Sequence, residues 1–159
     1  MTTSLLLAIP SMVPPDILLS PAKLIDFDYI YGLCEATMRE YVEADLGDCF
    51  EAIARPTITA LLSKGLFSTI EVNGLRVGAI AVEQHETHYQ LEELYVAPII
   101  QNRGIGKAVM AIVVTEASLR GTPIRLHVLA SNRARRFYEL LGFMVTRTTK
   151  EVTYMERIP

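Results

Sequence analysis

A short glycine-containing stretch, Gln101 to Lys107, constrains the fold of this chain more than any other segment. An apolar, strand-like segment at residues 91–96 precedes it. After it, apolar residues recur at three- and four-residue spacing, which is the pattern of a helix with one buried face. Gly104 and Gly106 allow a tight turn and the close approach of a ligand to backbone amides. The stretch is therefore predicted to join a strand to the start of a helix.

The start of that helix is expected to bind an anion. Its first amide N–H groups have no acceptor within the helix, and the helix dipole places partial positive charge there. Arg103 and Lys107 add full positive charges, so a phosphate or pyrophosphate is the best-suited ligand. Two other phosphate-binding motifs do not match this sequence. A Walker loop requires Ser or Thr where Ala108 stands, and a dinucleotide fingerprint requires a third glycine where Val109 stands.

Composition narrows the class of protein. A chain of 159 residues, half of them hydrophobic, suits one domain with a sizeable core. A net charge of −3 gives no general attraction to nucleic acid or to an anionic membrane, so neither is expected as a partner. Cys34 and Cys49 form no metal-ligand pattern, so we expect no metal, and reduced thiols in a cytoplasmic protein. The apolar residues 5–9 are too short to span a bilayer, and residues 1–16 are interpreted as an extended N-terminal arm.

The remaining periodicity predicts a mixed α/β fold. Asn73-Gly74 is a strong hairpin signal, Gly47 is expected to end the first long helix, and Asp48 to cap the second. Val77 is expected to share one face of its strand with Ala79 and Ala81. The predicted strands are residues 17–20, 67–72, 75–83, 89–96, 123–129, 143–147 and 151–157, and the predicted helices are residues 27–46, 49–62, 104–119 and a short one that ends at Gly142.

Three pieces of the sequence resemble one family, in its order and spacing. Gln101-Asn102-Arg103-Gly104-Ile105-Gly106 resembles the (Q/R)-x-x-G-x-(G/A) pyrophosphate loop of the GNAT superfamily of acyl-CoA N-acyltransferases. Leu94-Tyr95-Val96-x-Pro98 before the loop and the segment from Asn132 to Phe143 after it extend the match. The resemblance implies a single N-acetyltransferase domain over residues 1–159. Its mixed, mostly antiparallel sheet would be flanked by helices, and two central strands would splay to form the acetyl-CoA cleft.

The resemblance also implies a reaction and a set of donor contacts. An acetyl group would pass from acetyl-CoA to a primary amine by direct attack in a ternary complex. Backbone groups of Leu94, Tyr95 and Val96 would contact the pantetheine, and the Val96 amide would face the thioester oxygen. Asn132 would bond the pantetheine, cap a helix, or do both. Arg135 is expected to approach the phosphates, and Arg133 and Arg136 to be solvated. The pyrophosphate would be held by Gln101, Asn102, Arg103, Gly104, Ile105, Gly106 and Lys107.

Tyr138 is the candidate general acid, because it resembles the family tyrosine that lies near the coenzyme sulfur and a phenol can protonate a leaving thiolate. An ammonium substrate must first lose a proton. Glu92 and Glu93 are the candidate bases, although some family members need none. Glu93 is favoured because Glu92 shares a face with Leu94, which we place in the core. A bulge in this strand could reverse the preference for Glu93 over Glu92.

Acceptor recognition is expected from the first two helices, with Tyr31, Arg39, Tyr41 and Glu43 as candidates. The acidic run that contains Glu43 either attracts a cationic amine or is a solvated helix junction. A small-molecule amine is expected, because the chain leaves no appended domain to recognise a large partner. A protein N-terminus or lysine, a non-catalytic acyl-CoA sensor and a nucleotide-binding protein remain alternatives. A homodimer is compatible with the family.

Overall fold

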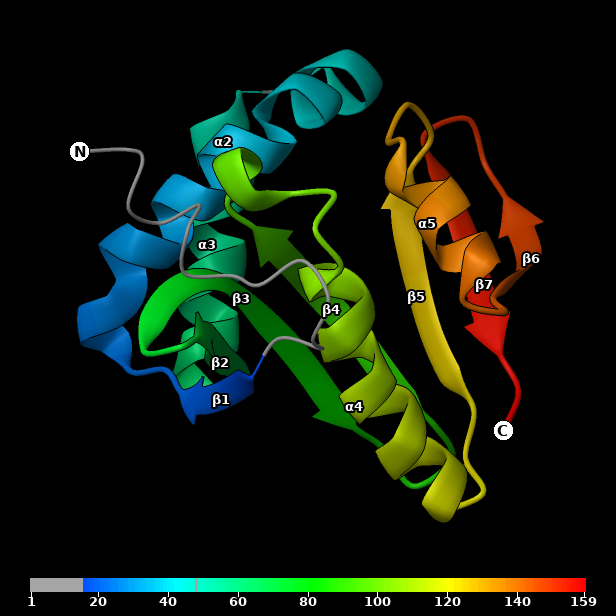
Figure 1. Ribbon diagram of the computed structural model, residues 1–159. Coiled ribbons are helices and arrows are strands. Elements are labelled where there is room, and N and C mark those ends of the chain that lie inside the picture. Colours follow the sequence, from blue (N-terminus) through cyan, green and yellow to red (C-terminus); the bar gives the residue numbers. More distant parts are fainter. Residues whose placement is uncertain (1–15, 48) are drawn as a thin grey trace.

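A seven-stranded mixed sheet forms the centre of the computed structural model, which describes residues 16–47 and 49–159 (Figure 1). The strand order is β1-β2-β3-β4-β5-β7-β6. The expected arm at residues 1–16, apart from Asp16, and the expected cap Asp48 lie outside the described residues. The strands are β1 (Ile17–Pro21), β2 (Phe67–Val72), β3 (Leu75–Gln84), β4 (Tyr89–Val96), β5 (Ile124–Leu129), β6 (Met144–Thr148) and β7 (Val152–Arg157).

Two of the long helices end at the glycines that the sequence predicts. Gly47 follows α2 (Phe27–Leu46) and Gly121 follows the end of α4 (Ile105–Leu119), both in the left-handed conformation, with φ of 66° and 65°. Asn73 and Gly74 both have positive φ, 51° and 79°, as a two-residue type I′ hairpin requires. The helices are α2 (Phe27–Leu46), α3 (Phe50–Ser63), α4 (Ile105–Leu119) and α5 (Ala134–Leu140), with short 3-10 helices η1 (Leu24–Asp26) and η2 (Pro98–Ile100).

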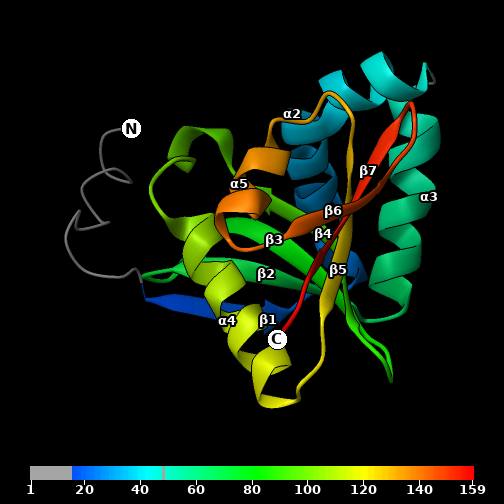
Figure 2. The same cartoon turned by 90° about the vertical axis from the view of Figure 1, so that its right-hand side faces the viewer.

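Each face of the sheet carries its own hydrophobic core (Figure 2). On one face, Ile70, Ile80 and Leu91 pack with Val109 and Met110 of α4. On the other face, α2 and α3 pack their buried stripes against the sheet, with Ile30, Phe50 and Ile58 fully buried beside Phe67 and Tyr95. Residues of both cores are needed to hold β4 in place, because β4 contributes Leu91 to the first core and Tyr95 to the second.

A bulge in β3 changes which face of the sheet a side chain occupies. In β3, Gly78 pairs with Ile70 while Arg76 pairs with Glu71, so Val77 is an extra residue. Val77 consequently packs in the α4 core, whereas Ala79 and Ala81 pack in the α2–α3 core. The prediction that Val77 shares a face with Ala79 and Ala81 was therefore wrong. Strict alternation fails at a bulge, and the isolated Gly78 beside Val77 is the local sign of it that the alternation pattern passed over.

The sheet opens between β4 and β5, as expected for this fold. The two strands pair in parallel only at Tyr89 with Ile124 and at Gln90 with Arg125. The other edge of β5 pairs with β7 along its whole length, from Ile124 with Arg157 to Leu129 with Val152. β5 therefore follows β7 and diverges from β4, which leaves the β5-facing edge of β4 uncovered beyond Gln90 (Figure 1).

Candidate active site

The glycine-containing loop has the geometry of an anion site. Asn102 and Gly104 both adopt left-handed conformations, with φ of 62° and 82°, and Gly104 directly precedes α4. Ile105 is 1% exposed and anchors the first turn in the core. The amide of Ala108 is bonded to the carbonyl of Gly104 at 3.0 Å, so the intrahelical bonds begin there. The amides of residues 105–107 precede that bond and point along the helix axis away from the helix body.

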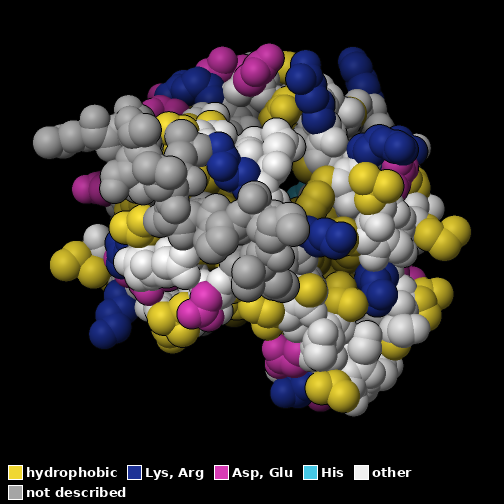
Figure 3. Space-filling view, viewed as in Figure 1, with side chains coloured by type: hydrophobic (Ala, Val, Ile, Leu, Met, Phe, Trp, Pro, Cys, Tyr) yellow, Lys and Arg dark blue, Asp and Glu magenta, His cyan; other side chains and the backbone are white. Residues whose placement is uncertain are grey.

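A groove of about 1060 Å³ runs from this loop to α5. Figure 3 shows the hollow between the α4 and α5 sides of the molecule, with lysine and arginine side chains at its edges. Arg103 and Arg135 do not line it, and Arg135 is paired with Glu139 at 2.9 Å. Arg133 is exposed, as expected, and also lines the groove. The loop residues that line the groove are Gln101, Asn102, Gly104, Ile105, Gly106 and Lys107.

The uncovered edge of β4 offers backbone groups to the same groove. The Ala97 amide donates to the Val77 carbonyl at 2.9 Å, so the N–H of Ala97 faces β3. The N–H and C=O of one residue share an edge of the strand and alternate between edges from residue to residue, so those of Leu94 and Val96 face the gap toward β5. The Val96 carbonyl accepts a hydrogen bond from Gln101 Nε2 at 2.9 Å, which ties the strand to the loop. The Tyr95 side chain points to the opposite core.

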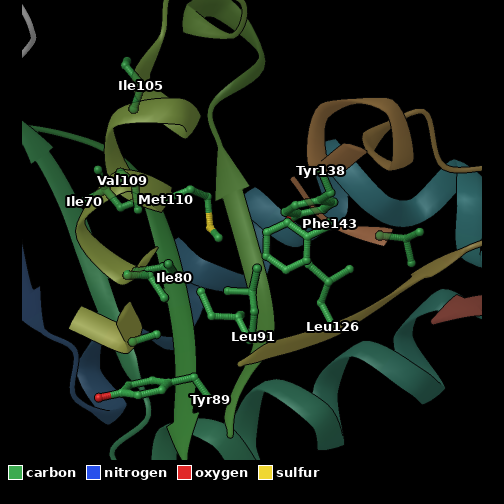
Figure 4. Packing of buried hydrophobic residues seen from close by; sticks show 14 of the residues in the cluster. Ile70, Ile80, Tyr89, Leu91, Ile105, Val109, Met110, Leu126, Tyr138 and Phe143 are labelled. Atoms are coloured by element: carbon green, nitrogen blue, oxygen red, sulfur yellow. The ribbon is translucent and has the colours of Figure 1, made fainter. Parts of the chain in front are cut away.

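Tyr138 of α5 lies where the groove ends. Its side chain is only 7% exposed, and its ring makes edge contacts with Phe137 and Phe143 at centroid distances of 5.0 and 5.6 Å. Figure 4 shows Tyr138 and Phe143 beside each other near Leu126. Burial raises the pKa of Tyr138 far above its ordinary value, and the charge of Glu93 raises it further. The phenol therefore keeps its proton at neutral pH.

Asn132 fixes the start of α5. Its Oδ1 accepts from the Ala134 amide at 2.9 Å, which ties the side chain to the first residue of α5, although the helix N-cap itself is Arg133. Its amide nitrogen lies 3.9 Å from Met38 Sδ of α2, so Asn132 also bridges the two sides of the opening. Asn132 lines the groove as well, where the same carboxamide is available to a ligand.

Glu92 and Glu93 lie at a second bulge. Glu93 pairs with Ala81 and Leu91 with Val82, so Glu92 is the extra residue in β4. Both residues line a second cavity, which we call the chamber. Burial raises the pKa of Glu93 to about 7, a hydrogen bond with Tyr95 lowers it by less, and the charge of Glu92 adds to the increase. A carboxylate with a pKa near neutrality is well matched to accept a proton from an ammonium group.

That chamber has a volume of about 240 Å³ and lies beside the groove. Side chains of α2 and α3 form one wall, and β4 and β5 form the others. The chamber and the groove meet, because five residues line both cavities. These shared residues are Met38, Leu94, Asn132, Ala134 and Tyr138.

The four side chains predicted to bind the acceptor do not line the chamber. Arg39 forms ion pairs with Glu35, Glu43 and Glu51 and stacks on Phe50 from outside. Tyr31 stacks on Phe27, and the guanidinium of Arg55 lies over both rings. Tyr41 lines the groove instead. Helices α2 and α3 thus form a wall as expected, but through their apolar stripes.

Met38 and Phe137 line the cavities although sequence reasoning did not select them. Cys34, Met38 and Val42 follow one another at four-residue spacing on α2, and all three line the chamber. That stripe is visible in the sequence, but a core stripe has the same pattern. Phe137 packs near the loop, since a Cβ placed on Gly106 would lie 3.3 Å from its ring.

The match to a known family agrees with this geometry. A family model described as an acetyltransferase (GNAT) domain matches residues 41–159. The chain belongs to the GNAT acetyltransferases. Among curated proteins no sequence matches the chain significantly.

Solved structures show the same fold at low sequence identity. PaiA N-acetyltransferase from Thermoplasma acidophilum, in complex with coenzyme A, is 19% identical over 91% of this chain and 99% of its own, with a TM-score of 0.70. The ribosomal-protein-S18-alanine N-acetyltransferase from Escherichia coli is 20% identical over 89% of this chain and 93% of its own, with a TM-score of 0.67. Naa50 from Arabidopsis thaliana, in complex with a bisubstrate analogue, is 19% identical over 89% of this chain and 97% of its own, with a TM-score of 0.63.

The residues of this GNAT domain fit acetyl-CoA as the acetyl donor. Helix-start amides and Lys107 are placed for a pyrophosphate, and the open edge of β4 is placed for an extended amide-bearing arm. Among residues 16–47 and 49–159, no group of three or more His, Cys, Asp or Glu side chains is arranged to hold a metal ion. No helix in that part of the chain is long and apolar enough to cross a membrane.

Proposed function

We propose that this enzyme acetylates the primary amine of a small molecule by direct attack of the amine on acetyl-CoA in a ternary complex. The observation that carries the proposal is the junction of the two cavities. Met38, Leu94, Asn132 and Tyr138 line both the donor groove and the chamber. A thioester delivered along the groove would reach an amine held in the chamber at this junction.

Each role in the proposal has a residue of suitable chemistry. Acetyl-CoA supplies the activated acetyl group. Glu93, with a pKa of about 7, accepts a proton from the ammonium of the acceptor, directly or through a water. The Val96 amide, on the open edge of β4, donates a hydrogen bond to the carbonyl oxygen as negative charge develops there. Tyr138 donates its proton to the leaving thiolate, and Asn132 positions the donor arm.

Cys34 has no role as a nucleophile in this mechanism. It is a free, buried thiol that lines the chamber, and burial raises its pKa to about 11. A thiol that is protonated at neutral pH is a poor nucleophile. The second cysteine, Cys49, is free and exposed. The reducing cytoplasm keeps cysteine thiols free. We therefore include a cytoplasmic location in the proposal.

Release of free coenzyme A thiol from acetyl-CoA, measured across a panel of amines, tests the transfer reaction. The proposal expects amine-dependent release above background. Binding of acetyl-CoA without release for any amine would favour the sensor alternative. One structurally similar enzyme is named for an alanine of ribosomal protein S18, and another was crystallised with the bisubstrate analogue CoA-Ac-MVNAL. Peptides with free N-termini and lysine side chains therefore belong in the panel, and faster turnover of these than of small amines would contradict the small-molecule proposal.

A further inference from the structure

The size of the chamber limits its occupant. Its volume of about 240 Å³ corresponds to roughly eight water molecules, at the ~30 Å³ each occupies in the liquid. The adjoining groove, at about 1060 Å³, is more than four times larger. A short amine fills a chamber of this size, whereas most of a peptide or an oligosaccharide would have to remain outside it.

The charge on the chamber walls is unevenly placed. Among the described residues, the carboxylates that line it are those of Glu92 and Glu93, on β4 next to the junction. In the same part of the chain no lysine or arginine lines it, and its one imidazole is that of His127 on β5. The wall formed by α2 and α3 carries no charged side chain at all, and includes Val42, Leu46, Phe50, Ile53 and Ala54.

The acidic residues on the neighbouring helix surfaces are engaged elsewhere. Arg39 pairs with Glu35, Glu43 and Glu51 on the outside of α2 and α3. Asp45 Oδ2 accepts hydrogen bonds from the amide and the hydroxyl of Ser131 at 2.8 and 2.7 Å. None of these carboxylates lines the chamber, so they do not provide a counter-ion for a second cation inside it.

We infer that the acceptor is a primary monoamine on a compact apolar group, such as a short alkylamine or a single-ring arylalkylamine. This inference rests on the proposed function and names the substrate class of the same site. The ammonium lies beside Glu93, and the apolar group packs against the α2–α3 wall. Glu92, Glu93 and His127 all lie on the β4 and β5 side, so a second ammonium or a carboxylate packed against the α2–α3 wall would have no ionic partner on that wall, which is costly. Diamines, polyamines and free amino acids are therefore excluded as good substrates.

Two matched pairs of probes test this inference through kcat/KM with saturating acetyl-CoA. Hexylamine and cadaverine have the same length and differ only in a terminal methyl versus a second ammonium. Isopentylamine and leucine differ only in the carboxylate. We expect the apolar member of each pair to react at least about a hundred-fold faster, because its partner must bury an unpaired charge. Equal or faster reaction of cadaverine, leucine or a methionine-initiated tripeptide would overturn the inference while leaving the transferase function intact.

A charge placed on the apolar wall should shift this preference. Ile53 lines the chamber from α3 and is only half-buried, so the Ile53→Asp variant adds a carboxylate at tolerable risk to folding. Ile53→Asn is the neutral control of the same size. We expect Ile53→Asp, but not Ile53→Asn, to raise the cadaverine to hexylamine ratio at least about ten-fold. An unchanged ratio in a variant that still melts cooperatively would contradict the assigned wall.

Thr57 provides a second test if Ile53→Asp does not fold. It also lines the chamber and is half-buried, on the next turn of α3. Thr57→Glu, compared with Thr57→Gln, should produce the same shift toward cadaverine. Binding of acetyl-CoA without turnover of any amine, apolar or charged, would contradict both this inference and the proposed function.

Discussion

The two cavities of this protein are built from different parts of the chain. The donor groove relies largely on backbone groups: the amides at the start of α4 and the open edge of β4 beside β5. The chamber relies on side chains from α2, α3, β4 and β5. Backbone groups change little when side chains are substituted, so the groove can keep one donor. Side chains can be exchanged, so we propose that the chamber determines which acceptor is used.

The largest expected effect lies at the junction of the two cavities. Tyr138→Phe removes the proton that the mechanism gives to the leaving thiolate, and kcat should fall about 10²- to 10³-fold. The dissociation constant for acetyl-CoA, measured by calorimetry, should change by no more than about two-fold, because the ring and its contacts with Phe137 and Phe143 remain. Tyr154→Phe is the matched control, since Tyr154 lines neither cavity. Full turnover by Tyr138→Phe would remove the acid role.

The chamber should show a pH dependence that the groove lacks. Glu93 acts as a base only when ionised, so with a pKa of about 7 we expect kcat/KM to rise through neutral pH and to lose about ten-fold for each pH unit below it. Glu93→Gln should lower kcat/KM at pH 8 by about ten- to a hundred-fold and remove this ionisation from the profile.

Glu92→Gln is the control for that experiment. It changes the neighbouring carboxylate on the same bulge, and we expect an effect below about three-fold with the rising limb retained. If Glu93→Gln kept the wild-type profile, or if Glu92→Gln abolished it, the assignment of the base would be wrong.

A substitution in the groove should instead change donor affinity. A Cβ on Gly106 would lie 3.3 Å from the Phe137 ring and beside the first amides of α4. Gly106→Ala should therefore weaken acetyl-CoA binding about ten-fold while kcat at saturation stays near that of the wild type. Gly32→Ala, in the middle of α2, is the control, because no atom lies within 4 Å of its added Cβ. Equal donor affinity in the two variants would contradict the placement of the pyrophosphate.

The smallest effect is expected on the outer surface of α2. Arg39→Gln breaks the ion pairs with Glu35, Glu43 and Glu51 but touches neither cavity. We expect kcat/KM to stay within about two-fold and the melting temperature to fall slightly. The measurement is steady-state kinetics beside thermal unfolding. A large rise in the KM for the amine, with donor binding unchanged, would restore Arg39 to the acceptor site.

The same contrast explains what the sequence could predict. The groove depends on local chemistry: glycines at positive φ, a helix start and a strand before it, all within about fifteen residues. Sequence motifs report such features, and the loop, the hairpin at Asn73-Gly74 and the divergence of β5 were predicted correctly. The chamber depends on tertiary packing. Arg39 and Glu43 are polar residues on the correct helix, but they lie on the outside of it.

Bulges set a second limit on prediction. Val77 is the extra residue in β3, so the residues after it are shifted by one position relative to β2. Val77 therefore lies in the α4 core, whereas Ala79 and Ala81 lie in the α2–α3 core. The bulge at Glu92 had been allowed for as an alternative, and it places both carboxylates in the chamber wall. Gly78 directly follows Val77 and is a local sign of the first bulge, because an isolated glycine inside a strand often accompanies one. No glycine or proline lies beside Glu92, so the sequence does not reveal where β4 changes register.

A crystal structure of the protein with coenzyme A would test the central claim most directly, namely that the groove delivers a thioester to the chamber through the junction at Tyr138. The account predicts pyrophosphate density at the amides of residues 105–107 and the coenzyme sulfur within about 4 Å of Tyr138 Oη, close enough for proton transfer directly or through one water. A coenzyme bound elsewhere, or a sulfur separated from Tyr138 by closed protein, would contradict it.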